Sequence, residues 1–403
     1  MGKGMTDTLP LLSAQLDFGL YAQRTGQRTF IRLMFRSPPS RLSTADVHLV
    51  LQSVVRANPA LSFRIRFSRG RAYQQWYPAE CDFAELFAEA EDAVAECVTK
   101  LLEEFVTSLD GAPFSARLIR SPENDYLVLV FDHALVDEQS LLLIKQQLDS
   151  PSAPDEGRLA RYQAAVNARR EQEAAATSGP GITFWTDRMK AVGEFPRPAP
   201  KPTRDIAFET VPGVAIPRSA RGSLFPYVLF SLHRALRDVG QPAPTSIGYP
   251  WGGVRNAEHA DVVGCFMNTV ISLDTVGPQT PAQAAGEFVT SWYDEIDHAD
   301  VPFTTVAALG SAFSGSVTAH LSYTHAATRA VRVAGVPVVE VLSGGGRANE
   351  ACAFLAAVSV HDDELQLRLL LDEEVTGYGS HEFGTRWRHW LTAAVSSRPQ
   401  QRT

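Results

Sequence analysis

One short segment of the sequence, Asp132-His133-Ala134-Leu135-Val136-Asp137, holds the residue types most suited to chemistry. The unperturbed pKa of histidine is about 6.5, so His133 can act as a general base near neutral pH or hold the proton of a nucleophile by hydrogen bonding. A carboxylate four positions later, Asp137, can orient that histidine or can pair elsewhere and fix the loop. The segment therefore predicts a site for proton transfer or for positioning a nucleophile.

The elements around this segment predict how it is held. Tyr126–Phe131 is apolar throughout, as in a strand that is buried on both faces, and Leu141–Leu148 has the pattern of a helix. An α/β sheet usually places its chemistry where a buried strand ends and a helix follows. We expect His133 to lie at such a strand end.

Strands and helices alternate along the rest of the chain, which predicts the α/β fold class. The expected strands are 28–36, 61–67, 72–77, 114–119, 126–131, 246–249, 266–273, 317–322, 351–360 and 364–371, and the expected helices are 43–58, 89–109, 141–148, 158–176, 182–192, 224–239, 281–297 and 381–395. The break at Thr177-Ser178-Gly179-Pro180-Gly181 suggests two lobes, 1–177 and 178–403.

A second candidate lies in the later half, where Gly248-Tyr249-Pro250-Trp251-Gly252-Gly253-Val254-Arg255 precedes Gly264-Cys265-Phe266-Met267-Asn268-Thr269. Its glycines permit close approach of an extended ligand, and Arg255 can neutralise a buried carboxylate. A simple turn leading into a strand is the alternative. The segment lacks the GxxxxGK[ST] and GxGxxG patterns of phosphate-binding loops.

The amino-acid composition excludes several classes of protein. The chain has 403 residues, 45% of them hydrophobic, and a net charge of -8, which excludes a disordered chain and argues against a general affinity for nucleic acid. We found no apolar run long enough to cross a membrane and no signal peptide at the N-terminus, so we expect a cytoplasmic protein without membrane contact. The four cysteines form no CxxC pair, and the histidines lack zinc-ligand spacing, so we expect neither disulfides nor a metal site.

The order of several motifs resembles the condensation-domain superfamily of nonribosomal peptide synthesis, which also includes chloramphenicol acetyltransferase. The motifs that carry this resemblance are Leu12-Ser13-Ala14-Gln15, Asn58-Pro59-Ala60-Leu61-Ser62-Phe63-Arg64, the HHxxxDG-like Asp132–Glu138, Gly248-Tyr249-Pro250 with Arg255, the GxFxNT motif Gly264–Thr269, and His298-Ala299-Asp300-Val301-Pro302-Phe303. They extend over most of the chain and leave its last part unmatched.

The resemblance implies a fold and a function. The fold is two chloramphenicol-acetyltransferase-like lobes with mixed sheets in a V, with an active-site tunnel at their junction. The function is that of a free-standing condensation enzyme, which forms an amide or ester by transferring an acyl thioester to an amine or hydroxyl acceptor. The thioester arrives on the phosphopantetheine arm of a carrier protein acting in trans, and the enzyme itself binds no cofactor.

The resemblance also assigns residues. His133 is implied to be the base or amine-positioning group, with Asp137 as the second catalytic motif residue. Asp137 is implied to pair with Arg255 and to hold the loop. We expect the tunnel or the substrate to contact Asp132, Glu138, Ser140, Tyr249, Trp251 and Asn268.

Two departures from the family pattern leave alternatives open. Asp132 replaces the first motif histidine, and Glu138 replaces the motif glycine. They allow a catalytically inactive recruitment domain, and Asp132-x-x-x-x-Asp137-x-x-Ser140 also fits heterocyclisation domains, which normally lack the histidine. Because carrier proteins are typically acidic, docking needs a basic face, for which Arg158, Arg161, Arg169 and Arg170 are candidates, with a solvated helix face as the alternative.

Overall fold

The structure, a computed structural model, describes residues 8–78, 80–151, 155–190, 205–216, 224–241, 244–253, 257–274, 281–309, 317–325, 331–341, 345–347, 354–361, 363–371 and 373–396. The chain divides into two compact units. Unit 1 comprises Met1–Ala174, Gly252–Met267 and Arg329–Ser343, and unit 2 comprises Ala175–Trp251, Asn268–Thr328 and Gly344–Thr403.

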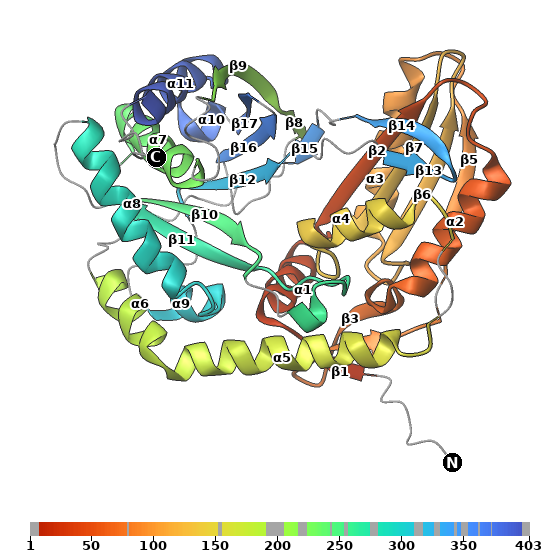
Figure 1. Cartoon of the computed structure of the whole chain (residues 1–403), viewed down its shortest axis with the longest axis horizontal. Helices are drawn as coiled ribbons and strands as arrows, with labels where there is room; N and C mark the ends of the chain where they lie inside the picture. The colour runs from red at the N-terminus through yellow and green to blue at the C-terminus, as the bar shows by residue number, and fades with distance from the viewer. Residues whose placement is uncertain are drawn as a thin grey trace, which may run out of the picture. The chain divides into compact units, whose positions relative to one another are not determined.

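A six-stranded mixed sheet with the strand order β13-β14-β2-β7-β6-β5 forms the centre of unit 1 (Figure 1). Its strands are β2 (Phe30–Ser37), β5 (Asp82–Phe87), β6 (Phe114–Arg120), β7 (Asp125–Asp132), β13 (Val331–Val333) and β14 (Val336–Glu340). The smaller sheet β1-β4-β3 consists of β1 (Thr8–Pro10), β3 (Phe63–Ser68) and β4 (Arg71–Trp76). The helices are α1 (Ser13–Thr25), α2 (Thr44–Ala57), α3 (Ala93–Thr107), α4 (Glu138–Gln147) and α5 (Arg158–Ser178), with the short turns η1 (Pro59–Ser62) and η3 (Ala257–His259).

Strand β7 is buried on both faces, as its apolar sequence predicts. Because successive side chains of a strand point to opposite faces, its alternate residues enter different clusters. Leu127, Leu129 and Phe131 pack with apolar residues of α2, α4 and α5. Val128 and Val130 pack with those of α3. The strand end that carries His133 is therefore anchored from both sides.

Unit 2 is built on a second six-stranded mixed sheet, with the strand order β11-β10-β12-β16-β17-β9. Its strands are β9 (Glu209–Ala215), β10 (Thr245–Trp251), β11 (Asn268–Asp274), β12 (Ala319–His325), β16 (Phe354–His361) and β17 (Glu364–Leu371), and β8 (Asp205–Ala207) pairs with β15 (Gly345–Arg347). The helices are α6 (Pro180–Lys190), α7 (Phe225–Asp238), α8 (Pro281–Asp297), α9 (Phe303–Leu309), α10 (Glu373–Thr376) and α11 (Ser380–Ser396). Helices α7 and α11 lie side by side over one apolar cluster (Figure 1).

These two mixed α/β units confirm the predicted fold class, and the V-shaped arrangement with its tunnel stays a prediction. The division into units differs from a single cut at 177/178 in two ways. The first boundary lies inside α5, at Ala174, and Gly252–Met267 and Arg329–Ser343 pack with unit 1. Two segments of the predicted second lobe therefore belong to the unit that contains His133. The Gly264–Thr269 motif is divided between the units.

Candidate functional site

Strand β7 ends at Asp132 and α4 begins at Glu138, so the predicted catalytic segment forms the turn between them. Asp137 is the N-cap of α4: its Oδ1 accepts a hydrogen bond from the Ser140 amide at 2.9 Å. A carboxylate at this position satisfies one of the amides that a helix start leaves unpaired. The helix start thus fixes the end of the turn.

Asp137 and Ser140 also tie this turn to the Gly264–Thr269 motif. The other carboxylate oxygen of Asp137 accepts a hydrogen bond from the Phe266 amide at 3.0 Å. The Ser140 hydroxyl accepts one from the Gly264 amide at 3.0 Å and lies 2.8 Å from both Asp137 Oδ1 and Gly264 O, either of which can take its single hydrogen. Asp137 is 4% exposed and Ser140 is fully buried. The two side chains therefore hold the turn, and the predicted partner Arg255 lies outside the described residues.

His133 is held so that one ring nitrogen is engaged within the turn. Its Nδ1 lies 3.2 Å from Val136 O, and its ring stacks on Phe18 of α1 with the centroids 4.4 Å apart. A carbonyl oxygen can only accept, so Nδ1 carries the hydrogen in this contact and Nε2 of the neutral ring keeps a lone pair. Burial lowers the pKa of His133, against hydrogen bonds and the Asp137 charge, which raise it. A neutral imidazole with an available Nε2 can accept a proton.

Asp132 lies on the other side of the same turn. One oxygen accepts a hydrogen bond from the Ala134 amide at 3.0 Å, and the other lies 3.7 Å from Nη1 of Arg28. Burial raises the pKa of this carboxyl, and the Arg28 charge opposes the shift. In this chain the residue that replaces the first motif histidine is thus an ion-pair partner within unit 1.

Glu138, the residue that replaces the motif glycine, is the first residue of α4. More than a third of its surface is exposed, yet the surrounding protein desolvates it enough to raise its pKa to about 7, against the attraction of Lys145. Its first-turn position is favourable for a negative charge. Glu138 therefore occupies the first turn of α4, directly after the Asp137 cap.

Three predicted substrate-binding residues belong to unit 2. Tyr249 is buried, and its hydroxyl accepts a hydrogen bond from Trp292 Nε1 at 3.2 Å. Trp251 packs at the edge of the unit 2 core. The Asn268 amide donates to Ala299 O and Val301 O, both at 2.8 Å, and its oxygen accepts from the Phe303 amide at 3.1 Å. Asn268 therefore fixes the 298–303 turn, where we expected contact with substrate.

Sequence reasoning missed several groups on α1 and around Asp132. Phe18 and Asp17 come from α1, and burial raises the pKa of Asp17 to about 7, with a further contribution from the Glu173 charge. Arg28 and Arg64 line a cavity beside Asp132. The only signal for Asp17 is that it is the one acidic residue of α1, and the two arginines are far apart in the sequence.

The predicted basic face on α5 is largely neutralised. Arg158 and Arg161 both pair with Asp155. Arg169 is 7% exposed and pairs with Glu173, four residues later on the same helix. Arg170 is exposed. The four arginines therefore form no continuous cationic surface, because one is buried and two share an acidic neighbour. The sequence pattern did not show either feature.

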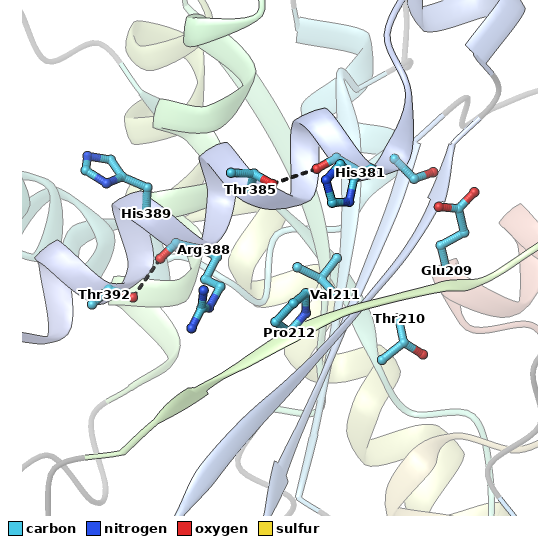
Figure 2. Close-up of a pocket in the computed structure, with 10 residues that line it drawn as sticks. Glu209, Thr210, Val211, Pro212, His381, Thr385, Arg388, His389 and Thr392 are labelled. Carbon is cyan, nitrogen blue, oxygen red and sulfur yellow. Dashed lines mark hydrogen bonds between the residues drawn. The ribbon is translucent and has the colours of Figure 1, made fainter.

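A larger hollow, of about 430 Å³, lies between β9 and α11 of unit 2 (Figure 2). Figure 2 shows two threonines of its lining, Thr385 and Thr392, hydrogen-bonded to backbone oxygens of their own helix. The side chains of Glu209, His381 and Arg388 in this lining are exposed. Solvated groups of this kind keep ordinary reactivity, so volume alone does not make this hollow the candidate site.

Within the described part of the chain, the structure contains no group of three or more His, Cys, Asp or Glu side chains arranged to hold a metal ion. Nor, within the same ranges, is any helix long and apolar enough to cross a membrane. Of the described cysteines, Cys81, Cys97 and Cys265 form no disulfide, and Cys352 lies outside the described residues.

Comparison with known proteins identifies proteins that are similar to this chain in sequence or in structure. No family model matches the chain. Over 283 residues, 65% of its length, the chain is 23% identical to tyrocidine synthase 3 of Brevibacillus parabrevis, and this stretch covers 4% of that protein. The chain thus corresponds to a small part of this relative.

Solved structures match over nearly the whole chain. The X-domain from teicoplanin biosynthesis has a TM-score of 0.75 at 15% identity, with 98% of this chain and 96% of that chain covered. The first condensation domain of the calcium-dependent antibiotic synthetase, solved with substrate analogue 3a, has a TM-score of 0.75 at 14% identity, covering 98% and 97%. A complex of the X-domain and OxyB matches with a TM-score of 0.72 at 16% identity, covering 98% and 95%. At these identities the likeness shows the fold.

Proposed function

We propose that this chain, which has the fold of the condensation-domain superfamily, transfers an acyl group from a carrier-bound thioester to an amine or hydroxyl acceptor. The observation that carries the proposal is the β7–α4 turn, which presents a neutral His133 with an available Nε2. The resemblance of the sequence motifs and the matching solved structures support it. The donor arrives on the phosphopantetheine arm of a carrier protein in trans.

The proposed reaction is balanced without a redox partner or metal ion. The acceptor nitrogen or oxygen forms a bond to the thioester carbonyl carbon, and the carbon–sulfur bond breaks. His133 Nε2 accepts a hydrogen bond or the proton from the acceptor, and the leaving thiolate takes up a proton. Positioned proton transfer of this kind typically contributes a factor of about 10²–10⁴ in rate.

Asp137 has a positioning role in this proposal. Both of its carboxylate oxygens are occupied by amides or a hydroxyl of the same unit. Oxygens that are engaged in this way within a buried network hold the turn together. The same hydrogen bonds weaken the heterocyclisation alternative, because that chemistry needs Asp137 as an acid or base.

Recruitment of another protein is the second candidate function. One structural neighbour, the X-domain from teicoplanin biosynthesis, is solved in complex with OxyB. Together with Asp132 and Glu138 at the motif positions, this neighbour favours a docking role as the alternative. Such a domain binds a partner and turns nothing over.

Reconstitution with an acyl-loaded carrier protein separates these functions. We expect mass spectrometry to find a product whose mass equals that of the acyl donor plus the acceptor minus the carrier thiol, and none when the chain is omitted. A product lighter by one further water would indicate heterocyclisation. Stable carrier or enzyme binding without any product would favour recruitment and overturn the proposal.

A further inference from the structure

A small cavity of about 40 Å³ lies in unit 1 beside the catalytic turn. Its lining includes Phe18 of α1, Thr29, Pro113, Asp132 and two arginines, Arg28 and Arg64. One ordered water needs about 10–15 Å³ by this kind of measure. The cavity therefore has room for a group of a few heavy atoms, and its charges decide which group.

Arg28 is rigidly held in the cavity wall. Its guanidinium lies over the Phe105 ring at 3.7 Å, and its Nε donates to Phe105 O at 2.7 Å. Asp132 is its ion-pair partner, at 3.7 Å from Nη1, which is longer than a charge-assisted hydrogen bond. Asp132 therefore offsets one positive charge of the lining through a long contact.

The second arginine is not offset. The Arg64 guanidinium lies over the Tyr77 ring at 4.2 Å, and in the part of the chain that the structure describes it has no ion-pair partner. Its Nε is buried without a hydrogen-bond acceptor, and so is the Thr29 hydroxyl. Stacking occupies the face of a guanidinium and leaves its in-plane N–H donors free. Unpaired buried donors are costly, so this lining favours an acceptor-bearing anion.

Electrostatics within the cavity point the same way. Burial lowers the pKa of Arg28, Asp132 opposes this, and the like charge of Arg64 lowers that pKa further. A bound anion between the two guanidinium groups relieves both the repulsion and the unpaired donors. A carboxylate suits the space and the planar fork of an arginine.

We propose that this cavity binds the carboxylate of the acceptor, so that the acceptor is a free amino acid or a similar small amine. The proposal rests on the proposed acyl transfer for its link to His133. Phe18 lines the cavity and also stacks on the His133 ring at 4.4 Å. The proposal places an amine a few bonds from the bound carboxylate next to His133. A carrier-bound acceptor has a thioester where this carboxylate lies, so it does not fit the cavity.

Ligand binding by the full chain tests this assignment without requiring turnover. The probes are the proteinogenic amino acids as free acids and the same compounds as primary amides, titrated while thermal unfolding is followed. We expect one or more free acids to raise the melting temperature and their amides to have no effect. Loss of charge-assisted hydrogen bonds in Arg64→Met should weaken binding about ten- to a hundredfold, and Arg64→Lys should weaken it less.

Arg66→Met is the matched control. Arg66 lies two residues further along the same strand and contacts the same Tyr77, but it pairs with Asp110 and does not line the cavity. Its substitution should leave amino-acid binding unchanged. The proposal is overturned if no free acid binds better than its amide, if Arg64→Met binds as the wild type does, or if inorganic phosphate binds as tightly with the same dependence on Arg64. Absence of acyl transfer with intact amino-acid binding would reject the proposed reaction and leave the carboxylate site in place.

Discussion

The two sides of the β7–α4 turn differ in how fully their polar groups are hydrogen-bonded. On the α4 side, both carboxylate oxygens of Asp137, the Ser140 hydroxyl and the Phe266 amide all have partners within about 3 Å. On the α1 side, His133 uses one ring nitrogen, and the Asp132–Arg28 pair is long. The first side has the character of a structural network, and the second retains hydrogen-bonding capacity for a ligand.

This difference indicates that the motif residues on the two sides have different roles. A satisfied buried network specifies one local structure, and its loss is measured in stability. A group that keeps an unused donor or acceptor near a cavity is suited to bind or react, and its loss is measured in function. Substitutions on the two sides should therefore have opposite signatures.

The largest stability effect is expected for Asp137→Ala. The change removes the N-cap of α4, at about 0.5–2 kcal/mol, and leaves the buried Phe266 amide without its acceptor, at about 1–3 kcal/mol. We expect the free energy of unfolding to fall by roughly 3 kcal/mol, measured by urea denaturation. Asp137→Asn keeps an acceptor oxygen and should lose less. An unchanged urea midpoint for Asp137→Ala would show that the network does not hold the turn.

Outside this turn, Asp17→Asn in α1 should change how stability depends on pH. The pKa of Asp17 is about 7 in the folded protein and 3.8 for the ordinary side chain, so between these values the folded state holds a proton that the unfolded state lacks. Stability linked to Asp17 is therefore full below pH 3.8, falls as the pH rises through this window, and is lost above about pH 7. The desolvated charge and its repulsion by Glu173 then destabilise the protein.

The variant lacks this charge, so its advantage over the wild type should grow with pH. We expect about 2 kcal/mol at pH 8.5, a value below the full linkage because part of the side chain is exposed. Urea midpoints at pH 4.5 and 8.5 measure it. A wild type that is equally or more stable than the variant at pH 8.5 would contradict the shifted carboxyl.

A smaller effect is expected for Ser140→Ala. The buried Gly264 amide loses its acceptor, and Gly264 O and Asp137 Oδ1 lose a neighbouring hydroxyl. We expect a loss of about 1–2 kcal/mol in unfolding free energy, read from the urea midpoint, with little change in acceptor affinity. A large loss of acceptor affinity at unchanged stability would move Ser140 to the functional side of the comparison.

Local patterns predicted the parts of this fold that depend on local chemistry. The burial of β7 on both faces follows from its apolar sequence, and Ser43 caps α2 by accepting from the Asp46 amide. The edge strand β5, Asp82–Phe87, was missed because its side chains are only half-buried, so its apolar signal is weak. Helix α3 begins at Ala93, later than the predicted 89, and α9 was not predicted.

The candidate site was predictable only where its residues are close in sequence. His133 and Asp137 share one turn, so a motif brings them together. Arg28 precedes β2 and Arg64 lies on β3 of the smaller sheet, so tertiary packing brings them together, and nothing in either local sequence shows that Asp132 is near both. Sequence spacing cannot show that Gly252–Met267 packs with unit 1, which is a property of long-range packing.

The most direct test of the account compares the initial rate of acyl transfer by the wild type and by His133→Gln, at matched amounts of folded protein. Glutamine keeps a polar side chain of similar reach and cannot serve as a base at neutral pH. We expect a rate at least about a hundredfold lower for His133→Gln, with a urea midpoint close to that of the wild type. Equal rates for the two proteins would contradict it.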